Sequence, residues 1–320
     1  MLHTMFLTVF TFVTLNCENL FDAKHDTLKQ DLEYCEGGSR HWSTQRYWHK
    51  LNNIGREIIS CGGEEENWVV PDLVALVEVE NDTVLHDLTR RSILRNAGYE
   101  YLMTDSPDPR GIDVALLYHP FSFTPDTAYS IRITPPEGYK ATRDILYVRG
   151  DCFLDGDSTM RLHAFVVHSP SRSGGSKVSE QYRIHVASRL CQSIDSIYRG
   201  EAEAKILVMG DFNDYHTDKS LRLIGAHGMK NVSAGARGTN GAEGTYRHQG
   251  RWGSLDHILI STPLYGILSI DWCRVNDAPF LYEEEPTYGG IRPRRTYRGF
   301  KYDYGGYSDH FPLVFRFSIP

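Results

Sequence analysis

Short apolar runs, each followed closely by a polar or acidic residue, recur along the whole chain and constrain its fold more than any other feature. The runs are rich in Val, Ile, Leu and Phe, as expected for strands that are buried on both faces. The strands predicted from them are 6–15, 72–79, 114–118, 145–148, 162–168, 205–209, 257–260 and 312–317.

Helical spacing of apolar residues separates several of these strands. Leu51, Ile54 and Ile58 share one face of a predicted helix, and the pattern favours amphipathic helices over 47–59, 83–96 and 180–198. Segments 24–44, 61–68, 231–253 and 277–307 are polar or glycine-rich and are predicted to be loops. Strands alternating with helices indicate an α/β fold, and without a long linker we expect one domain over 1–320.

The charge balance argues against an extended nucleic-acid-binding face. The 320 residues carry a formal net charge of −7, whereas proteins that grip nucleic acid over a broad surface are usually basic. A local basic patch around a site could still suffice, so a nucleic-acid substrate stays open.

Cysteine usage and the N-terminal stretch predict the cellular setting. The six cysteines form no CxxC pair and lie mostly in apolar runs, so buried reduced thiols are expected. The apolar N-terminus lacks a basic start and a small-residue cleavage site, and no run is long enough to cross a bilayer. We therefore expect a cytoplasmic monomer without stable membrane insertion.

The sharpest chemical signal is the pair Asp309-His310, which directly precedes the last predicted strand. An Asp-His dipeptide alone is typical of a surface turn. Asp256, however, opens another buried strand, where a carboxylate is costly unless it is paired. An aspartate bonded to one ring nitrogen fixes the tautomer of a histidine and leaves the other nitrogen as a base. Asp256 and His310 are therefore a candidate catalytic pair.

Other polar residues stand at the ends of predicted strands. Glu78 follows a mostly apolar strand without an intervening turn, and oxygen ligands of this kind suit Mg²⁺. The residues that could supply such a site are Asn16, Glu18, Glu78 and Asp309. Three further polar residues, His168, Asp211 and Asn213, end or follow two more strands.

These fragments, in this order, resemble the endonuclease/exonuclease/phosphatase superfamily, which includes pancreatic deoxyribonuclease, abasic-site nucleases, inositol polyphosphate 5-phosphatases and bacterial sphingomyelinases. The matching pieces are TLNCENLFD at 14–22, LVEVEN at 76–81, RGIDVALLY at 110–118, VVHSPSR at 166–172, VMGDFND at 208–214, GSLDHILIS at 253–261 and YSDHFPL at 307–313. The resemblance implies a four-layered sandwich of two packed mixed β-sheets flanked by helices, with one metal-centred site at one end.

The resemblance also implies roles for the polar residues. A Mg²⁺ ion, or Mn²⁺ in its place, would be bound by Glu78, with Asn16 and Asp309 close to it and Glu18 beside it or at a second position. His310, oriented by Asp256, would activate the attacking water. Asp211 and Asn213 would position the nucleophile, and His168 would contact the phosphate.

One departure from the superfamily pattern concerns the substrate. The abasic-site branch carries tyrosine at the position of His168 and asparagine at that of Ser171, so a dedicated abasic-site enzyme is disfavoured. Ser171 and Arg172 are candidate phosphate contacts. Arg110 is either a substrate contact or part of a structural ion pair.

We thus expect a metal-dependent phosphoester hydrolase, in the first place a phosphodiesterase or nuclease. The alternative is a phosphomonoesterase or a lipid head-group phosphodiesterase. Segment 277–307, here called the flap, is rich in tyrosine and arginine. It is either a substrate-recognition element or a structural loop whose tyrosines pack on the sheet edge.

Overall fold

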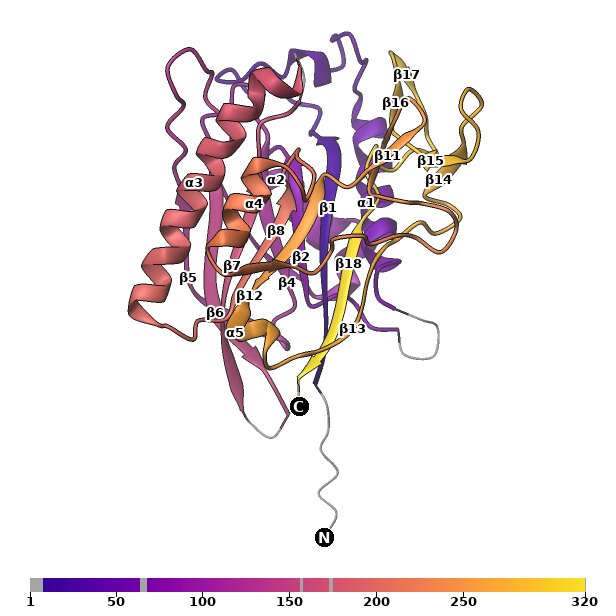
Figure 1. Cartoon of the computed structure of the whole chain (residues 1–320). Coiled ribbons are helices and arrows are strands. Elements are labelled where there is room, and N and C mark those ends of the chain that lie inside the picture. Colours follow the sequence, from indigo (N-terminus) through magenta and orange to yellow (C-terminus); the bar gives the residue numbers. More distant parts are fainter. Residues whose placement is uncertain (1–7, 64–67, 156–157, 173–174, 320) are drawn as a thin grey trace.

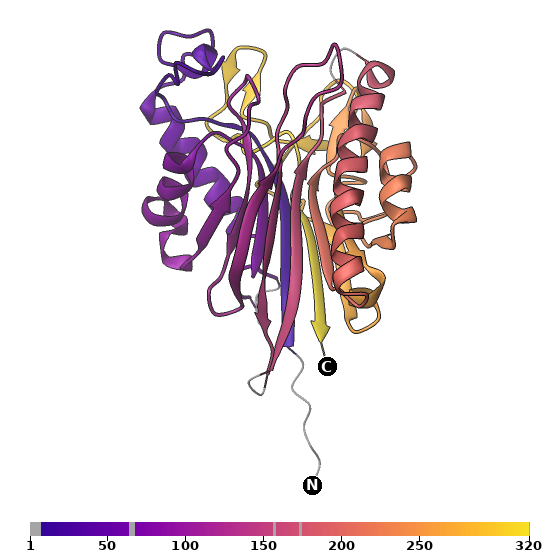
Figure 2. The same cartoon turned by 90° about the vertical axis from the view of Figure 1, so that its left-hand side faces the viewer.

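Two six-stranded mixed β-sheets pack face to face, with helices on both outer sides (Figures 1 and 2). The computed structural model describes residues 8–63, 68–155, 158–172 and 175–319. This arrangement confirms the predicted four-layered α/β sandwich. The first strand begins and the last strand ends at one end of the sheets, and the flap lies at the opposite end (Figure 1).

The first sheet has the order β13-β18-β1-β2-β4-β3. Its strands are β1 (Thr8–Leu20), β2 (Leu73–Val79), β3 (Glu100–Met103), β4 (Asp113–Tyr118), β13 (Ser269–Val275) and β18 (Leu313–Ile319). The central strands β1 and β2 are parallel, and all other neighbours are antiparallel.

The second sheet repeats this plan with the order β5-β6-β7-β8-β12-β9. Its strands are β5 (Phe123–Ile131), β6 (Ile145–Phe153), β7 (Thr159–His168), β8 (Ile206–Asp211), β9 (Met229–Asn231) and β12 (Asp256–Ser261). Here β7 and β8 form the parallel pair. Each sheet thus offers the carboxyl ends of two parallel strands at its centre.

Alternation of side chains along the strands builds three apolar cores. In β1, Phe10 and Phe12 face the core between the sheets, whereas Val13 and Leu15 face the core beneath the helix α1 (Thr44–Ile59). The period of two places successive residues on opposite faces. A third core lies between the second sheet and the helix α3 (Ser176–Gly200). Apolar burial on both faces of each sheet explains why the strand sequences are almost continuously hydrophobic.

The long helices agree with the predictions except at their N-terminal ends. Helix α1 begins at Thr44 rather than 47, because Ser43 caps it by accepting a hydrogen bond from the Arg46 amide. Helix α3 likewise begins at Ser176 rather than 180. The shorter helices α4 (Lys219–Ala226) and α5 (Thr262–Tyr265) were not predicted.

The predicted helix over 83–96 is wrong as a continuous element. The chain instead forms α2 (Asp82–His86), a π-helical turn η3 (Asp87–Arg91) and a 3₁₀ turn η4 (Ile93–Ala97). Ser92 is extended, and its hydroxyl accepts a hydrogen bond from the Leu94 amide. This local hydrogen bond starts a new turn and competes with continuation of the helix.

Several predicted loops contain short structured elements. Segment 24–44 includes a 3₁₀ turn, η1 (Leu32–Tyr34). Segment 231–253 ends in the hairpin β10 (Tyr246–His248) and β11 (Arg251–Gly253). The flap contains two hairpins, β14 (Tyr282–Glu284) with β15 (Ile291–Pro293), and β16 (Tyr297–Arg298) with β17 (Lys301–Tyr302). Of the predicted first strand, residues 6 and 7 lie outside the described part, and the strand continues to Leu20.

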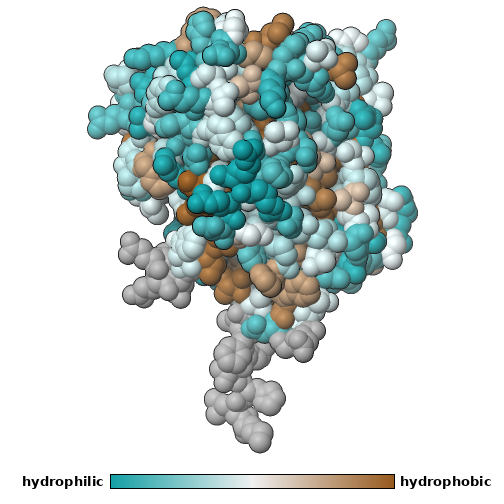
Figure 3. Space-filling model, turned by 180° about the vertical axis from the view of Figure 1, so that it is seen from behind, coloured by the Kyte–Doolittle hydropathy of each residue, from teal (hydrophilic) through white to brown (hydrophobic). Residues whose placement is uncertain are grey.

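The remaining general expectations concern thiols and surface. All six cysteines are free; four are buried, as predicted, whereas Cys35 and Cys273 are partly exposed. Within the described residues, no helix is long and apolar enough to cross a membrane. The face seen in Figure 3 is mostly hydrophilic, with the hydrophobic side chains in small groups.

Candidate active site

A pocket of about 540 Å³ lies where the carboxyl ends of the two parallel strand pairs meet. It is lined by Asn16, Asn19, Glu78, Arg110, His168, Ser171, Arg172, Asp211, Asn213, Tyr215, Tyr246, His248, Leu255, Asp309 and His310. Ten of the twelve residues predicted for the site are in this lining. The other two contact residues that line it: the Glu18 amide donates to Oδ1 of Asn16, and Asp256 pairs with His310.

Left-handed backbone geometry aims several of these side chains into the pocket. Asn19, Glu78 and Asn213 all have positive φ, which is uncommon outside glycine and tends to cluster at functional sites. The pairing register also shifts around Glu78, between β2 and both of its neighbours. Such bulges re-aim side chains at the end of a strand, so Glu78 leaves the sheet plane and faces the pocket.

His310 and Asp256 form the predicted pair. Nδ1 of His310 lies 2.7 Å from Oδ2 of Asp256, and the Thr245 hydroxyl donates to the same oxygen at 2.6 Å. Both partners are buried. Burial is the largest influence on the pKa of His310 and lowers it, but the carboxylates of Asp256, Asp211 and Asp309 together raise that pKa well above its ordinary value. The pair therefore holds the imidazole in one orientation and leaves Nε2 as its second nitrogen.

Asp211 and His168 are neighbours in the pocket lining. The Asn16 side-chain amide donates to Oδ2 of Asp211 at 3.1 Å, and Nε2 of His168 lies 3.9 Å from the same oxygen. Burial, with a further contribution from Asp256, raises the pKa of Asp211 to about 7. Burial, followed by the charge of Arg143, lowers the pKa of His168 well below its ordinary value. His168 is therefore a neutral imidazole, and its buried Nδ1 has no hydrogen-bond partner among the described residues.

Asn213 is held in place by its own strand end. Its backbone amide donates to Oδ1 of Asp211 at 2.8 Å, and its side-chain amide donates to the Ser169 carbonyl at 3.1 Å. Because the side-chain nitrogen has a further hydrogen to donate, it can contact an oxygen of a bound phosphate. The geometry thus agrees with the predicted positioning role.

The oxygen atoms around Glu78 fit a small divalent cation. Oε2 of Glu78 accepts the Asn19 amide at 2.9 Å, whereas Oε1 has only Arg110 Nη2 at 3.8 Å and His168 Nε2 at 3.9 Å as neighbours in the described ion pairs. Together with Asn16 and Asp309, this carboxylate offers the hard oxygen donors that Mg²⁺ and Mn²⁺ prefer.

A second set of three ligand atoms, from Asp211, Asp256 and His310, lies within 4.8 Å of one another. Since Nδ1 of His310 and Oδ2 of Asp256 already bond to each other, this set is better described as the histidine–aspartate pair with a neighbouring carboxylate than as a cation site.

Glu18 lies away from the pocket and contacts the flap. Its Oε2 accepts the Thr296 amide at 2.6 Å, and its Oε1 lies 3.3 Å from Nε of Arg295. Lys50 Nζ on α1 is 3.8 Å from Oε2. Both carboxylate oxygens thus contact the protein itself, and the place of Glu18 beside the metal or at a second position stays a prediction.

Arg110, Ser171 and Arg172 all reach the pocket, as predicted. Arg110 is half-exposed and donates to the side chain of Asn19. The guanidinium of Arg172 stacks 4.5 Å from the ring of Tyr215. Their contact with substrate stays a prediction.

Sequence reasoning did not identify the aromatic rim of the pocket. The ring of Tyr246 lies 4.9 Å from that of His310 and is nearly parallel to that of His248. Tyr246 and His248 both belong to β10, inside a segment that was predicted to be a loop. Aromatic residues alternating within a glycine-rich segment were the only available signal.

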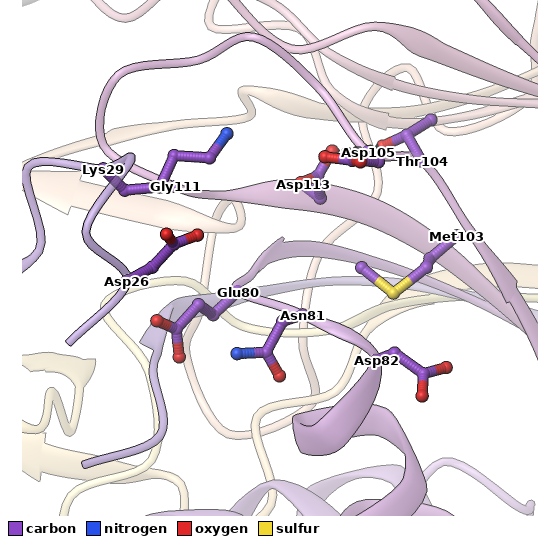
Figure 4. A pocket seen from close by; sticks show the side chains of 10 residues that line it. All are labelled: Asp26, Lys29, Glu80, Asn81, Asp82, Met103, Thr104, Asp105, Gly111 and Asp113. Atoms are coloured by element: carbon purple, nitrogen blue, oxygen red, sulfur yellow. Dashed lines mark hydrogen bonds between the residues drawn. The ribbon is translucent and has the colours of Figure 1, made fainter. Parts of the chain in front are cut away.

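A separate pocket of about 360 Å³ is drawn in Figure 4. It is lined by Asp26, Lys29, Glu80, Asn81, Asp82, Met103, Thr104, Asp105, Gly111 and Asp113. Burial and the charge of Asp22 raise the pKa of Glu80 to about 9. Five of its ten lining residues are Asp or Glu and one is a lysine, so even with Glu80 protonated this second pocket would repel a phosphate. The pocket at the strand ends is the better phosphate site.

Comparison with known proteins agrees with this geometry. A profile described as the endonuclease/exonuclease/phosphatase family matches residues 11–318. The chain belongs to this family. Members of the endonuclease/exonuclease/phosphatase family hydrolyse phosphoesters, and the chain is accordingly a phosphoesterase of this family. No curated protein sequence matches it at a significant level.

Solved structures of the endonuclease/exonuclease/phosphatase family share the fold. A family protein from Bacteroides thetaiotaomicron is 14% identical, with 98% of this chain and 99% of that chain covered and a TM-score of 0.62. A mannosyl-6-phosphatase of the same species is 15% identical, with coverages of 96% and 99% and a TM-score of 0.60. The human Nocturnin catalytic domain with bound sulfate is 17% identical, with coverages of 98% and 95% and a TM-score of 0.56. At these identities the likeness shows the fold alone.

Proposed function

We propose that this protein is a divalent-metal-dependent phosphodiesterase that acts with Mg²⁺ or Mn²⁺. One observation carries the proposal: His310, held by Asp256 at 2.7 Å, lies in the same pocket as the oxygen donors of Glu78 and Asn16. A base and a cation site in one pocket are the two requirements for hydrolysing a phosphoester with water.

Each residue has a defined part in the proposed reaction. In its neutral form, His310 accepts a proton from the attacking water at Nε2, while Asp256 keeps the ring in place. Asn213 and neutral His168 donate hydrogen bonds to the phosphoryl oxygens and hold the group in line for attack. A divalent cation bound at Glu78 would supply charge neutralisation on those oxygens.

The charge of the pocket favours diesters. Its lining contains two arginines, Arg110 and Arg172, beside the carboxylates of Glu78 and Asp309, and Asp211 adds part of a third negative charge because its pKa is raised to about 7. A phosphodiester carries one negative charge and a monoester close to two at neutral pH. The less charged group therefore meets less repulsion. The rings of Tyr246 and His248 at the rim could stack on a base or sugar of the substrate, so nucleic acid is included in the proposal.

A phosphomonoesterase is the second candidate. It is favoured by the similarity to a structure named as a mannosyl-6-phosphatase, which covers 96% of this chain. In this alternative, Arg110 and Arg172 would bind the extra charge of the terminal phosphate.

The monomeric state and the cytoplasmic location of the protein remain predictions.

A substrate panel tests the proposal. With Mg²⁺ present, plasmid DNA, bis-p-nitrophenyl phosphate, p-nitrophenyl phosphate, inositol phosphates and sphingomyelin are assayed with the wild type and His310→Ala. We expect release from a diester that His310→Ala abolishes. Release from monoesters alone would favour the phosphatase, and cleavage of sphingomyelin alone would indicate a lipid head-group enzyme. Turnover that is unchanged in His310→Ala would contradict all three.

A further inference from the structure

The guanidinium of Arg295 lies between two carboxylates at the edge of the candidate active site. Its Nε is 3.3 Å from Oε1 of Glu18, and its Nη2 is 3.0 Å from Oδ2 of Asp309. Glu18 and Asp309 are largely buried, with 7% and 21% of their side chains exposed, whereas Arg295 is 44% exposed. One flap side chain thus links the end of β1 to the residue preceding His310.

The backbone next to Arg295 is held in place by the hydrogen bonds of the following residue. The next residue, Thr296, donates its amide to Oε2 of Glu18 at 2.6 Å and its hydroxyl to the Tyr307 carbonyl at 3.2 Å. Lys50, fully buried on α1, donates to the Thr296 hydroxyl at 2.6 Å. Arg295 is therefore presented to the two carboxylates by an ordered support and does not reach them as a loose surface side chain.

The negative charges of Glu18 and Asp309 are stabilised by a cation placed between them. Burial and the charge of Asp309 both raise the pKa of Glu18, whereas the charges of Lys50 and Arg295 lower it. A guanidinium is always charged and can bond to two carboxylates at once. Arg295 contacts Oδ2 of Asp309, and Asp309 lines the same pocket as Glu78.

We propose that Arg295 is a built-in counter-ion, occupying the position between Glu18 and Asp309 that a second divalent cation would otherwise take. The site then binds a single divalent cation, on the side of Glu78 and Asn16. This inference rests on the proposed metal-dependent function and deepens it, because it fixes the number of ions in the working enzyme.

Glu18 acts as an anchor for the flap, and Arg295 acts as a positioning residue for Asp309. Removing the guanidinium leaves Asp309 without this counter-charge and Glu18 with Lys50 alone, whose Nζ lies 3.8 Å from Oε2. Two neighbouring carboxylates are a donor set that attracts a hard divalent cation.

The test measures Mn²⁺ binding to the full chain by electron paramagnetic resonance, with free and bound ion counted after titration. The wild type is compared with Arg295→Gln, with the double variant Arg295→Gln/Glu18→Gln, and with Arg298→Gln. Arg298 is a matched control, because this flap arginine pairs with Glu283 and Asp303 and not with the site. Thermal unfolding of each variant confirms that it is folded.

We expect one Mn²⁺ per chain in the wild type and in Arg298→Gln. Arg295→Gln should bind a second, weaker ion, which the double variant loses again. Two ions in the wild type would overturn the inference, and so would a single ion of unchanged affinity in Arg295→Gln. A wild type that binds no Mn²⁺ would instead overturn the proposed metal-dependent function itself.

Discussion

At the scale of the residue, His310 and Asp256 are the side chains on which turnover depends most directly. Replacing His310 by Ala removes the proposed base, and replacing Asp256 by Ala removes the group that orients it at 2.7 Å. Each change should lower kcat about a hundredfold or more, as expected for loss of a general base. Steady-state hydrolysis of the preferred ester measures this. His86→Ala, an exposed histidine on α2, should keep wild-type turnover, and near-normal kcat in His310→Ala would remove the proposed base.

A buried glutamate on α1 should make stability depend on pH. Burial raises the pKa of Glu57 from 4.5 to about 8, and its Oε2 has no hydrogen-bond partner among the described residues. The folded state therefore holds a proton that the unfolded state releases, so stability is fully present below pH 4.5 and falls as the pH rises towards 8. At about 1.4 kcal/mol per pKa unit, the loss has an upper bound of about 5 kcal/mol.

Glu57→Gln removes this titration and should therefore gain stability over the wild type as the pH rises. Urea unfolding at pH 5.5 and pH 8.5 measures the difference between the two proteins. A difference that is the same at both pH values would show that Glu57 does not titrate as described.

Single residues differed in how far the sequence could predict them. Asp309-His310 and Glu78 carry a signal because polar residues directly next to apolar strands are costly without a function. Arg295 carries no such signal, since its partners Glu18 and Asp309 are set by the path of the flap. For the same reason the contact of Glu18 with Thr296 could not be anticipated.

At the scale of the element, the close approach of β7 and β8 brings Asp211 to the pocket. Gly210 has φ of 142°, and a Cβ there would lie 1.8 Å from the Val167 carbonyl oxygen. Gly210→Ala must therefore push the two strands apart. We expect a loss of about 2–4 kcal/mol of stability from strain and broken pairing, together with reduced turnover.

Gly200→Ala at the end of α3 is the matched control for this change. A Cβ at Gly200 meets no heavy atom within 4 Å, so the substitution should be close to neutral. Urea unfolding of both variants gives the comparison. Equal stability of Gly210→Ala and the wild type would show that the strands can separate without cost.

Elements were predictable where apolar periodicity alone defines them. The strands β2, β7 and β8 and the helices α1 and α3 follow from their buried faces. The helix over 83–96 failed because the Ser92 hydroxyl and the Asn52 side chain, which accepts the Ile93 amide, redirect the backbone. Short hairpins such as β10–β11 lack a buried apolar face of their own, so no periodicity marks them.

At the scale of the whole molecule, two sheets of similar plan face each other, and each contributes one parallel strand pair to the pocket. Seven motifs in family order predicted this architecture. The composition added little, because a net charge of −7 describes the average surface and not the pocket. The choice between diester and monoester depends on how a few charges are arranged in the folded chain.

We propose that these strand ends form one metal-dependent hydrolytic site. Removing the metal ion tests this claim without changing the chain. The wild type and Glu78→Gln are dialysed against EDTA and assayed on bis-p-nitrophenyl phosphate before and after Mg²⁺ or Mn²⁺ is added. We predict no turnover in the chelator, recovery of the wild type with either ion, and little recovery of Glu78→Gln. Full turnover of the wild type in the chelator would contradict the claim.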